Sequence, residues 1–581
     1  MEHDLLFKKR HSLAHLLAMA ALEHDPLARL SVGPVTENGF YYDIDFSEGK
    51  TPTPEDLKTL EKSMRKFVNK KLDFKKRVVT ADSAREVFGN NPYKLAIIDD
   101  IEKGGAEITL YDTDSFSDLC EGPHIENTGE IDAKSFTLTH LAGAYWRGDE
   151  QNPMLTRIYG IAFDTEAELD TYLTQQEEAK KRDHRLLGEQ LDLFCFDENI
   201  GKGLPLWLPK GNIIKEELEN WAKKTETEWG YQRVTTPIIT KENLFYTSGH
   251  LPLYKESMYA PIVIEEENYY LKPMNCPFHH KIFSARPRSY RELPLRIAEY
   301  GWCHRYEDSG SLFGLMRVRG MQMNDAHIYV SREQAVEEFI QVIKLHEYYY
   351  RALGITEYMM ELALRDPKNM DKYHGDEEDW QLAESMTREA MEKSGVPYTV
   401  VNEGAAFYGP KMDFQITSSI GRPFTASTNQ LDLFMGKKFS LEYTDSDGSK
   451  KTPVVIHRAP LGTHERFIGF LIEHYAGAFP FWLAPVQVAI LPVSEDIYEY
   501  AEEINLTLKK LGYRTEMKMN ETLGKRIRET KVEKIPYTIV LGKQEMEART
   551  VTLESYANGK VGVFPHEELL DILAIDLQEK R

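Results

Sequence analysis

Hydrophobic and polar positions over residues 193 to about 483 change irregularly between the two-residue period of a strand and the longer period of a helix. This region lacks the regular strand-helix rhythm and the glycine-rich turn of a nucleotide-binding parallel sheet. The pattern therefore favours an antiparallel sheet with helices packed on it. Residues 484–581 differ, because VQVAILPV, YRTEMKM and YTIVLG are typical strands separated by an amphipathic and a basic helix. They predict a small α/β domain.

The N-terminal part of the chain mixes a first helix with short strands such as GFYYDID, which predicts an α+β domain over residues 1–162. A strongly charged stretch, TEAELDTYLTQQEEAKKRDHRLLGEQ, predicts a linker helix within residues 163–190. The antiparallel domain is then expected at 191–483 and the last domain at 484–581. The chain is thus predicted to be an α+β multidomain protein, and its 581 residues suffice for several separate cores.

Composition restricts the partners. With 71 Lys and Arg against 93 Asp and Glu the net charge is −22, so a polyanion must be met by a local basic patch. Residues 66–77 and 525–531 form two such patches, although each alone fits a solvated helix face equally well. The four cysteines are far apart, the first residues are too polar for a signal peptide, and prolines interrupt the longest apolar stretch. We expect a cytoplasmic protein without a membrane span.

The segment CHRYEDSGSLFGLMRVRGMQMNDAHIYV carries the most chemistry in the chain. Two runs of strand-forming residues flank a Gly/Ser turn, and the hairpin that they predict would place Arg305 and Glu307 on one face, with Arg317 returning on the partner strand. Charge alternation on a hairpin is more often a solvated face than a functional one. The pattern alone therefore leaves both interpretations open.

This segment resembles motif 2 of class II aminoacyl-tRNA synthetases, in the version found in threonyl-tRNA synthetases. VTTPI is similar to motif 1 and LGTHERFIGF to motif 3, and KPMNCPFHH, EGAAFYGPKMDF and STNQLDL lie at matching places between them. The resemblance covers essentially the whole chain. It implies a class II antiparallel catalytic sheet, an N-terminal α+β editing domain, a C-terminal α/β anticodon-binding domain, and a homodimer formed through motif 1.

The resemblance also implies an ATP site. A bent triphosphate requires cations on both sides, because the carboxylate of the amino acid attacks the α-phosphorus in line. Arg305 would lie at the α-phosphate and Arg466 at the γ-phosphate, with Mg²⁺ sharing the charge. Glu307 would bind the adenine amino group, and Arg317 would help to hold the phosphates.

Three residues of the resembling positions would bind a catalytic zinc: Cys276, His327 and His457. They are 51 and 130 residues apart, so no local spacing indicates a metal site, and each alone is more typical of a protein core. Threonine could bind zinc through its amine and hydroxyl, so valine would be rejected by about 10⁴-fold. The same resemblance places further residues in the substrate pocket, namely Asp325, Tyr408, Lys411, Thr428 and Gln430.

Met321 and Met323 depart from the family pattern in this pocket. Met321 stands where a phenylalanine often stacks on adenine, and Met323 replaces a frequent glutamine near the amino-acid carboxylate. A thioether packs against a base with less geometric specificity, so we expect altered ATP contacts and retained activity.

Serine defeats the zinc-based selection, because it lacks only a methyl group worth roughly 1 to 3 kcal/mol. A second, hydrolytic site is therefore expected. HSLAH places His11 and His15 on one helix face, and DLCEGPH adds Cys120 and His124, a set that could also bind zinc. The resemblance implies instead a metal-free pocket that hydrolyses seryl-tRNA. The remaining expected members of this pocket are Asp118 and Lys94, with Tyr41 and Tyr42 as walls.

The two ends of the chain complete the comparison with the family. The first helix begins almost at Met1, so we expect a form without the small domain that often precedes it in bacterial members. At the other end, Asn520 and Glu545 match positions that contact anticodon bases, and the basic helix over residues 525–531 would meet phosphates. Glu554 stands where an arginine is expected.

Two other functions fit parts of the sequence. One is a synthetase-like RNA-binding or regulatory protein that has lost catalysis, which the three arginines and the three possible zinc ligands argue against. The other is a free-standing editing hydrolase whose central domain only binds tRNA. Threonine-dependent exchange of pyrophosphate into ATP would exclude both.

Overall fold

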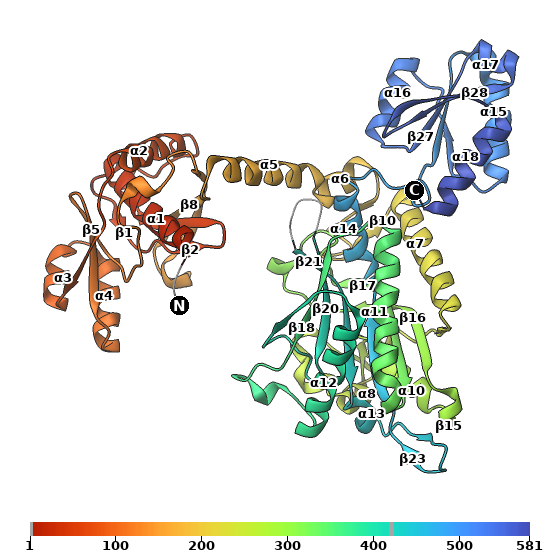
Figure 1. Ribbon diagram of the computed structural model, residues 1–581, viewed down its shortest axis with the longest axis horizontal. Helices are drawn as coiled ribbons and strands as arrows, with labels where there is room; N and C mark the ends of the chain where they lie inside the picture. The colour runs from red at the N-terminus through yellow and green to blue at the C-terminus, as the bar shows by residue number, and fades with distance from the viewer. Residues whose placement is uncertain (1–3, 418–422, 581) are drawn as a thin grey trace. The chain divides into compact units, whose positions relative to one another are not determined.

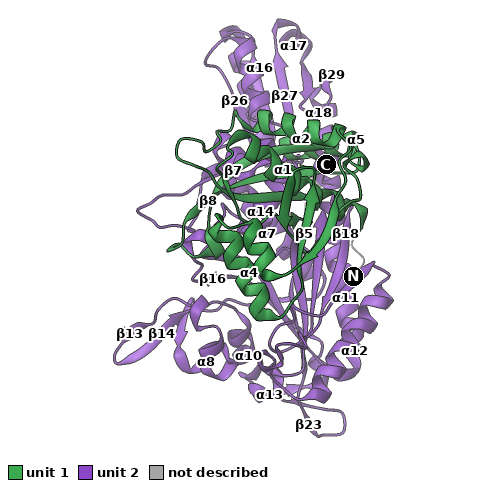
Figure 2. Ribbon diagram, turned by 90° about the vertical axis from the view of Figure 1, so that its left-hand side faces the viewer, with its two compact units in different colours: residues 1–177 green, residues 178–581 purple. Residues whose placement is uncertain are grey.

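The computed structural model describes residues 4–417 and 423–580 (Figure 1). The chain forms two compact units, residues 1–177 and 178–581, which Figure 2 colours separately. The division falls inside helix α5 (Glu166–Arg182), which a second helix, α6 (His184–Gln190), follows directly. The predicted linker helix is therefore two helices, and Asp183 between them caps α6 through a hydrogen bond from the Arg185 amide.

The described residues of unit 1 form two antiparallel sheets, the helices α1 to α4 and the first part of α5. The first sheet has the order β1-β3-β8-β7, with β2 paired to β3, and the second has the order β4-β5-β6. The strands are β1 (Arg29–Leu30), β2 (Val35–Thr36), β3 (Gly39–Asp45), β4 (Lys75–Val79), β5 (Ile108–Thr113), β6 (Phe116–Leu119), β7 (Phe136–Tyr145) and β8 (Met154–Ala162). The helices are α1 (Leu5–His24), α2 (Leu57–Asn69), α3 (Ala81–Val87) and α4 (Pro92–Gly104).

Helix α1 forms the centre of unit 1, lying beside α2 and against β3 (Figure 1). Asp4 starts the helix by accepting a hydrogen bond from the Phe7 amide. Leu13, Leu16 and Leu17 are fully buried, and they pack with the apolar face of α2 in one core. Because this helix is buried on most of its surface, polar residues on it must be paired within the unit.

The centre of unit 2 is an eight-stranded sheet with the order β11-β16-β17-β24-β21-β20-β18-β19. Its inner pairs are antiparallel, and only the two edge pairs, β11 with β16 and β18 with β19, are parallel. The predicted antiparallel sheet is thus confirmed. The strands are β11 (Gln232–Arg233), β16 (Leu295–His304), β17 (Gly320–Val330), β18 (Tyr358–Ala363), β19 (Tyr398–Val401), β20 (Lys411–Thr417), β21 (Pro423–Asp432) and β24 (Val454–Ala459).

One face of this sheet carries the main core. Ile328, Ile456 and Leu431 lie on this face and pack with Phe339 and Ile343 of α11. Helices α11 (Ala335–Ala352) and α12 (Glu377–Ser394) run side by side along it (Figure 1). Successive side chains of a strand point to opposite faces, so the residues next to these apolar ones face the other side. That other side carries the candidate site, to which α10 (Cys276–Ser284) and α14 (His464–His474) contribute.

The C-terminal part of unit 2 contains a five-stranded sheet with the order β26-β25-β27-β28-β29. Strand β25 is parallel to both of its neighbours, β26 and β27, whereas β28 is antiparallel to β27 and to β29, in agreement with the predicted α/β domain. The strands are β25 (Val488–Pro492), β26 (Thr515–Met517), β27 (Tyr537–Leu541), β28 (Thr550–Ser555) and β29 (Gly559–Pro565). The helices are α15 (Tyr498–Lys510), α16 (Leu523–Val532), α17 (Lys543–Ala548) and α18 (His566–Glu579).

Candidate active sites

Strand register aligns four of the predicted residues in one row across the sheet. His327 of β17 is paired with His457 of β24, His457 with Gln430 of β21, and Gln430 with Lys411 of β20. Residues paired in this way present their side chains on the same face. The row therefore brings together positions that span more than a hundred residues of sequence. Asp325, two residues before His327, shares that face.

Cys276 reaches this row from the first turn of α10, and its sulfur and one nitrogen of each histidine lie within 4.8 Å of one another. The other nitrogens are occupied. His327 Nδ1 lies 2.8 Å from His279 Nδ1, and His457 Nε2 lies 2.9 Å from Asp432 Oδ2. His327 Nε2 and His457 Nδ1 are buried and have no hydrogen-bond partner among the described residues. Two orphaned nitrogens beside a thiol fit a metal ion.

Burial sets the charge states around this cluster. It lowers the pKa of His327 well below the usual value, so the imidazole is neutral, as a metal ligand must be. It raises the pKa of the Cys276 thiol well above the usual value, with Asp325 adding to the rise. Burial also raises the pKa of Asp325, against the hydrogen bond from Asn275 that favours its charged form. A cation at this position would stabilise the anionic forms of Cys276 and Asp325 and would therefore lower both pKa values.

The neighbouring pocket residues are tied to one another. Lys411 Nζ lies 2.7 Å from Asp413 Oδ2, and the Thr428 hydroxyl donates to Asp413 Oδ1 at 2.6 Å. The Tyr408 hydroxyl donates to Gln430. Asp413 was not among the predicted residues, although its place two residues after Lys411 in a strand was a usable signal. The same holds for Asp432, two residues after Gln430.

Of the four predicted ATP-binding residues, three lie in the loop at the end of the β16-β17 hairpin and Arg466 lies in the first turn of α14. The prediction that Arg305, Glu307 and Arg317 lie on the strands of the hairpin is wrong, because β16 ends at His304 and β17 begins at Gly320. They occupy the connecting loop, where Arg317 Nε lies 3.6 Å from Glu307 Oε2. Desolvation and then the charge of Arg317 lower the pKa of Arg466, so two guanidinium groups share this space. Such an arrangement favours a bound polyanion.

The two methionines differ in their surroundings. Met321 is 6% exposed and packs against Cys303 and Val318. Met323 is half-buried and lies opposite Thr463, the residue that caps α14. A buried Met321 leaves little of its side chain to stack on a base.

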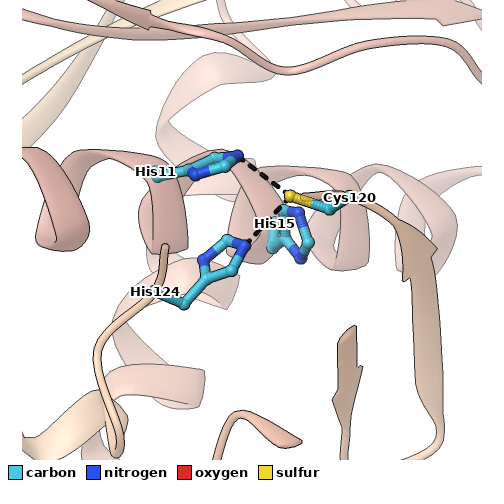
Figure 3. Close-up of side chains that lie close together, drawn as sticks. All are labelled: His11, His15, Cys120 and His124. Atoms are coloured by element: carbon cyan, nitrogen blue, oxygen red, sulfur yellow. Dashed lines mark hydrogen bonds between the residues drawn. The ribbon is translucent and has the colours of Figure 1, made fainter. Parts of the chain in front are cut away.

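A second cluster lies in unit 1 (Figure 3). His11 and His15 project from one face of α1 toward Cys120, which follows β6, and toward His124. Cys120 Sγ lies 3.2 Å from His11 Nε2 and 3.3 Å from His124 Nε2. One ligand atom of each of the four residues lies within 4.8 Å of the others, so this set, like that around Cys276, could hold a metal ion.

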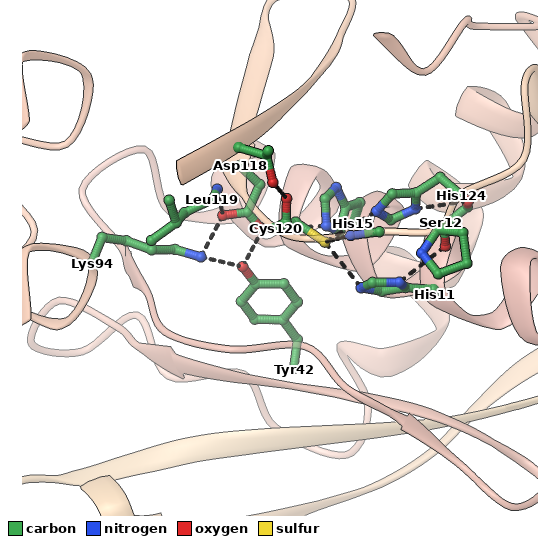
Figure 4. A network of polar contacts seen from close by, with 12 residues as sticks. His11, Ser12, His15, Tyr42, Lys94, Asp118, Leu119, Cys120 and His124 are labelled. Atoms are coloured by element: carbon green, nitrogen blue, oxygen red, sulfur yellow. Dashed lines mark hydrogen bonds and ion pairs between the residues drawn. The ribbon is translucent and has the colours of Figure 1, made fainter. Parts of the chain in front are cut away.

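The cluster continues into a buried polar network (Figure 4). Lys94 of α4 forms an ion pair with Asp118 of β6, and Tyr42 donates a hydrogen bond of 2.5 Å to the same carboxylate. His15 Nε2 lies 3.6 Å from Asp118 Oδ2. Tyr41, the residue before Tyr42 in β3, points to the opposite face, where Arg157 covers its ring. Only one of the two tyrosines expected as walls therefore joins this network.

Burial keeps the thiol and two of the imidazoles of the unit 1 cluster uncharged. It raises the pKa of the Cys120 thiol to about 12 and lowers the pKa values of His15 and His124. A thiol with this pKa is a weak nucleophile at neutral pH, and an imidazole with a lowered pKa can accept a hydrogen bond but is a weak base. The arrangement can position a water molecule.

The predicted anticodon residues are less clearly arranged. Asn520 is exposed. Both oxygens of Glu545 are used, because they accept hydrogen bonds of 2.8 Å from the Gly542 amide and the Thr552 hydroxyl. The expectation that the basic helix α16 faces phosphates fails for Arg526, which is 4% exposed and donates to the carbonyls of Pro492 and Lys518.

Three family models match the chain. Residues 108–159 match the second additional domain of threonyl and alanyl tRNA synthetases, and residues 259–475 match the class II tRNA synthetase core domain. Residues 487–574 match an anticodon-binding domain. Each match lies within one of the regions described above.

Whole-chain relatives agree with these matches. A threonine–tRNA ligase of Thermus thermophilus is 46% identical over all of this chain and 90% of its own length, and that of Geobacillus kaustophilus is 46% identical over 98% and 88%. The crystal structure of the RNA binding domain of threonyl-tRNA synthetase from Cryptosporidium parvum superposes with a TM-score of 0.65 at 35% identity, covering 68% of this chain and 98% of that one. Within residues 4–417 and 423–580, every helix is too short or too polar to cross a membrane. The chain belongs to the threonine–tRNA ligase family of class II aminoacyl-tRNA synthetases.

Proposed function

We propose that the face of the eight-stranded sheet around His327 activates threonine with ATP and transfers it to tRNA, and that the cluster around Cys120 hydrolyses seryl-tRNA. The ligase reaction and the editing of mischarged tRNA are those of the family. The residues that carry them are our assignment. One observation supports it most: register and α10 together gather Cys276, His327 and His457, which the sequence keeps far apart.

In this assignment Cys276, His327 and His457 hold zinc through the sulfur and the two orphaned nitrogens. When bound, zinc supplies a Lewis acid that takes the amine and hydroxyl of threonine together. Asp325 and Tyr408 lie beside this position and would orient the ammonium group. Valine offers no hydroxyl, so it would leave the metal and the polar groups around it unsatisfied.

ATP would bind at the hairpin loop, with Mg²⁺. Arg305, Arg317 and Arg466 provide the cations for the triphosphate, and Glu307 accepts the adenine amino group. The threonine carboxylate is already ionised, so attack on the α-phosphorus needs no base and releases pyrophosphate. The pairing of Arg317 with Glu307 is then exchanged for contacts with ATP.

Hydrolysis of seryl-tRNA in unit 1 needs a water molecule aimed at the ester carbonyl. The side chains of this cluster would hold and orient this water by hydrogen bonds, because burial lowers the pKa values of His15 and His124 and leaves them weak bases. Lys94, held by Asp118, supplies a positive charge beside the ester. We propose a metal-free pocket here and place the boundary of the hydrolytic domain near residue 162. The linker, catalytic and anticodon-binding segments then follow at 163–190, 191–483 and 484–581.

We also propose a homodimer in the cytoplasm. Ile238 and Trp302 are 43% and 40% exposed and lie close to Thr236 in the motif 1 region, where a partner surface would cover them. The four cysteines are free thiols, which suits a reducing compartment. Sedimentation of Ile238→Asp beside wild type tests the dimer, and an unchanged mass would contradict this surface.

Threonine-dependent exchange of pyrophosphate into ATP, combined with metal analysis, tests the whole assignment. Wild type is expected to contain one zinc per chain and to catalyse the exchange. Absence of exchange with seryl-tRNA hydrolysis intact would contradict the ligase role and favour an editing hydrolase. Two zincs per chain would contradict the metal-free pocket in unit 1.

A further inference from the structure

His184 lies beneath the loop that carries Arg317. It is the first residue of α6 and is fully buried, and its ring contacts both α14 and the loop. His184 Nε2 accepts a hydrogen bond of 3.1 Å from the Leu315 amide. An accepting nitrogen carries no proton, so the proton lies on Nδ1, which faces Glu473 Oε1 at 2.7 Å. Glu473 of α14 therefore selects the tautomer that can hold the loop.

The loop segment above this ring is a tight turn. The amide of Phe313 donates to the carbonyl of Arg317 at 3.2 Å, and the amide of Arg317 donates back at 3.2 Å. The Leu315 amide points down to His184 instead. Gly314 has φ of +47°, and a Cβ placed there would lie 2.1 Å from His184 Nε2. Only glycine fits between the turn and the ring.

The contact extends to the edge of α6. The ring of Phe313 meets that of His184 edge-on at 5.6 Å, and the guanidinium of Arg185 lies 4.3 Å from the centre of the Phe313 ring. The turn is thus held from α6 by one buried hydrogen bond and two ring contacts. The same short helix directly continues the chain from α5.

We infer that His184, with its tautomer set by Glu473, is a positioning residue for ATP: it fixes the turn of residues 313–317 and thereby the guanidinium of Arg317. This inference rests on the proposed role of Arg317 at the phosphates. It assigns a function in amino-acid activation to the first residue of α6, which lies in the segment predicted as a linker. His184 is not among the residues proposed to contact ATP or threonine.

The test compares substitutions that keep or remove the accepting atom. His184→Phe keeps a buried ring without the acceptor, and His184→Gln places a carbonyl oxygen near the position of Nε2. His346→Phe is the matched control, because His346 is also fully buried in unit 2 but contacts Val342 and Asn429, away from the proposed ATP residues. The assay is threonine-dependent pyrophosphate exchange at varied ATP and varied threonine, with zinc content measured in parallel.

His184→Phe is expected to raise the KM for ATP by about tenfold, because the Leu315 amide loses its buried partner. The KM for threonine and the zinc content should stay unchanged, and hydrogen exchange at the Leu315 amide should accelerate. His184→Gln should restore most of the ATP affinity, and His346→Phe should leave it unchanged. If His184→Phe does not fold, Glu473→Ala takes its place. It should also raise the KM for ATP without changing the KM for threonine, but by a smaller factor.

An unchanged KM for ATP in folded His184→Phe, or an equal loss for ATP and threonine, would overturn the inference. So would an equal rise in the His346→Phe control. These results differ from failure of the proposed function, in which wild type itself would show no threonine-dependent exchange.

Discussion

Removing the charge of Lys94 should strongly destabilise unit 1. Lys94 and Asp118 are both 2% exposed and form an ion pair, and the Asp118 carboxylate accepts further hydrogen bonds from Tyr42 and the Leu119 amide. In Lys94→Met the apolar stem remains and the ammonium is lost. Asp118 is then a buried anion without a cation, which costs about 3 to 5 kcal/mol. Solvent cannot screen this charge, because neither partner reaches the surface.

A double-mutant cycle separates this electrostatic cost from lost packing. Asp118→Asn keeps the size of the side chain and can still accept from Tyr42. The double variant Lys94→Met with Asp118→Asn therefore buries no unpaired charge and should recover all but about 1 kcal/mol of the loss. Lys134→Met is the control for an exposed ion pair in the same unit, since Lys134 and Glu166 are 65% and 49% exposed. Lys134→Met should lower the stability of unit 1 by less than about 1 kcal/mol.

Native-state hydrogen exchange on the full chain provides the measurement. The opening free energies of amides in α4 and β6 report the stability of unit 1 without unfolding unit 2. Lys94→Met should lower these opening free energies by about 3 to 5 kcal/mol and should abolish hydrolysis of seryl-tRNA. The reasoning is refuted if Lys94→Met costs no more than Lys134→Met, or if the double variant is as unstable as the single one.

Three further predictions concern unit 2. Cys276→Ala should lose one zinc per chain together with threonine-dependent exchange, and metal analysis showing retained zinc would contradict the ligand set. Arg458→Met should lower the unfolding free energy by about 3 kcal/mol in urea titration, because Glu226 is fully buried 2.9 Å from Arg458 and keeps only Arg233 as a cationic partner among the described residues. Burial raises the pKa of Glu465 to about 7, above the unfolded value of about 4.3, so its stabilising contribution is complete below about pH 4 and is lost as pH rises through 7. Glu465→Gln should therefore gain stability relative to wild type between pH 5 and pH 8 in thermal unfolding, and a constant difference would contradict this.

The sequence allowed the fold to be predicted well where local periodicity determines it. The irregular strand pattern predicted the antiparallel sheet, and period two placed Asp325 and His327 on one face. Register could not be predicted in the same way. The pairing of His327 with His457 joins strands 130 residues apart, and no local pattern encodes which residues meet across such a distance. Only the family resemblance anticipated that these positions belong together.

The errors arose where a local pattern has two structural solutions. Alternating charges around Arg305 suggested strands, but the glycines and serines there form a loop that starts directly after His304. Arg526 lies in a basic helix, yet its long side chain turns inward and satisfies two carbonyls, which composition cannot reveal. The charged linker pattern likewise did not show that His184 is buried. Each of these outcomes depends on tertiary contacts with distant residues.

The two clusters differ in the chemistry that their surroundings permit, and under the proposed assignment one protein needs both. A metal that demands an amine and a hydroxyl distinguishes threonine from valine, but serine satisfies it and differs by only about 1 to 3 kcal/mol. Correction must therefore use a separate site that binds the smaller side chain and positions a water molecule, which is the role proposed for the cluster in unit 1. Since the two clusters belong to different compact units, each can be disabled alone. Cys276→Ala should leave seryl-tRNA hydrolysis intact, and Lys94→Met should leave threonine activation intact, so that the second variant accumulates seryl-tRNA.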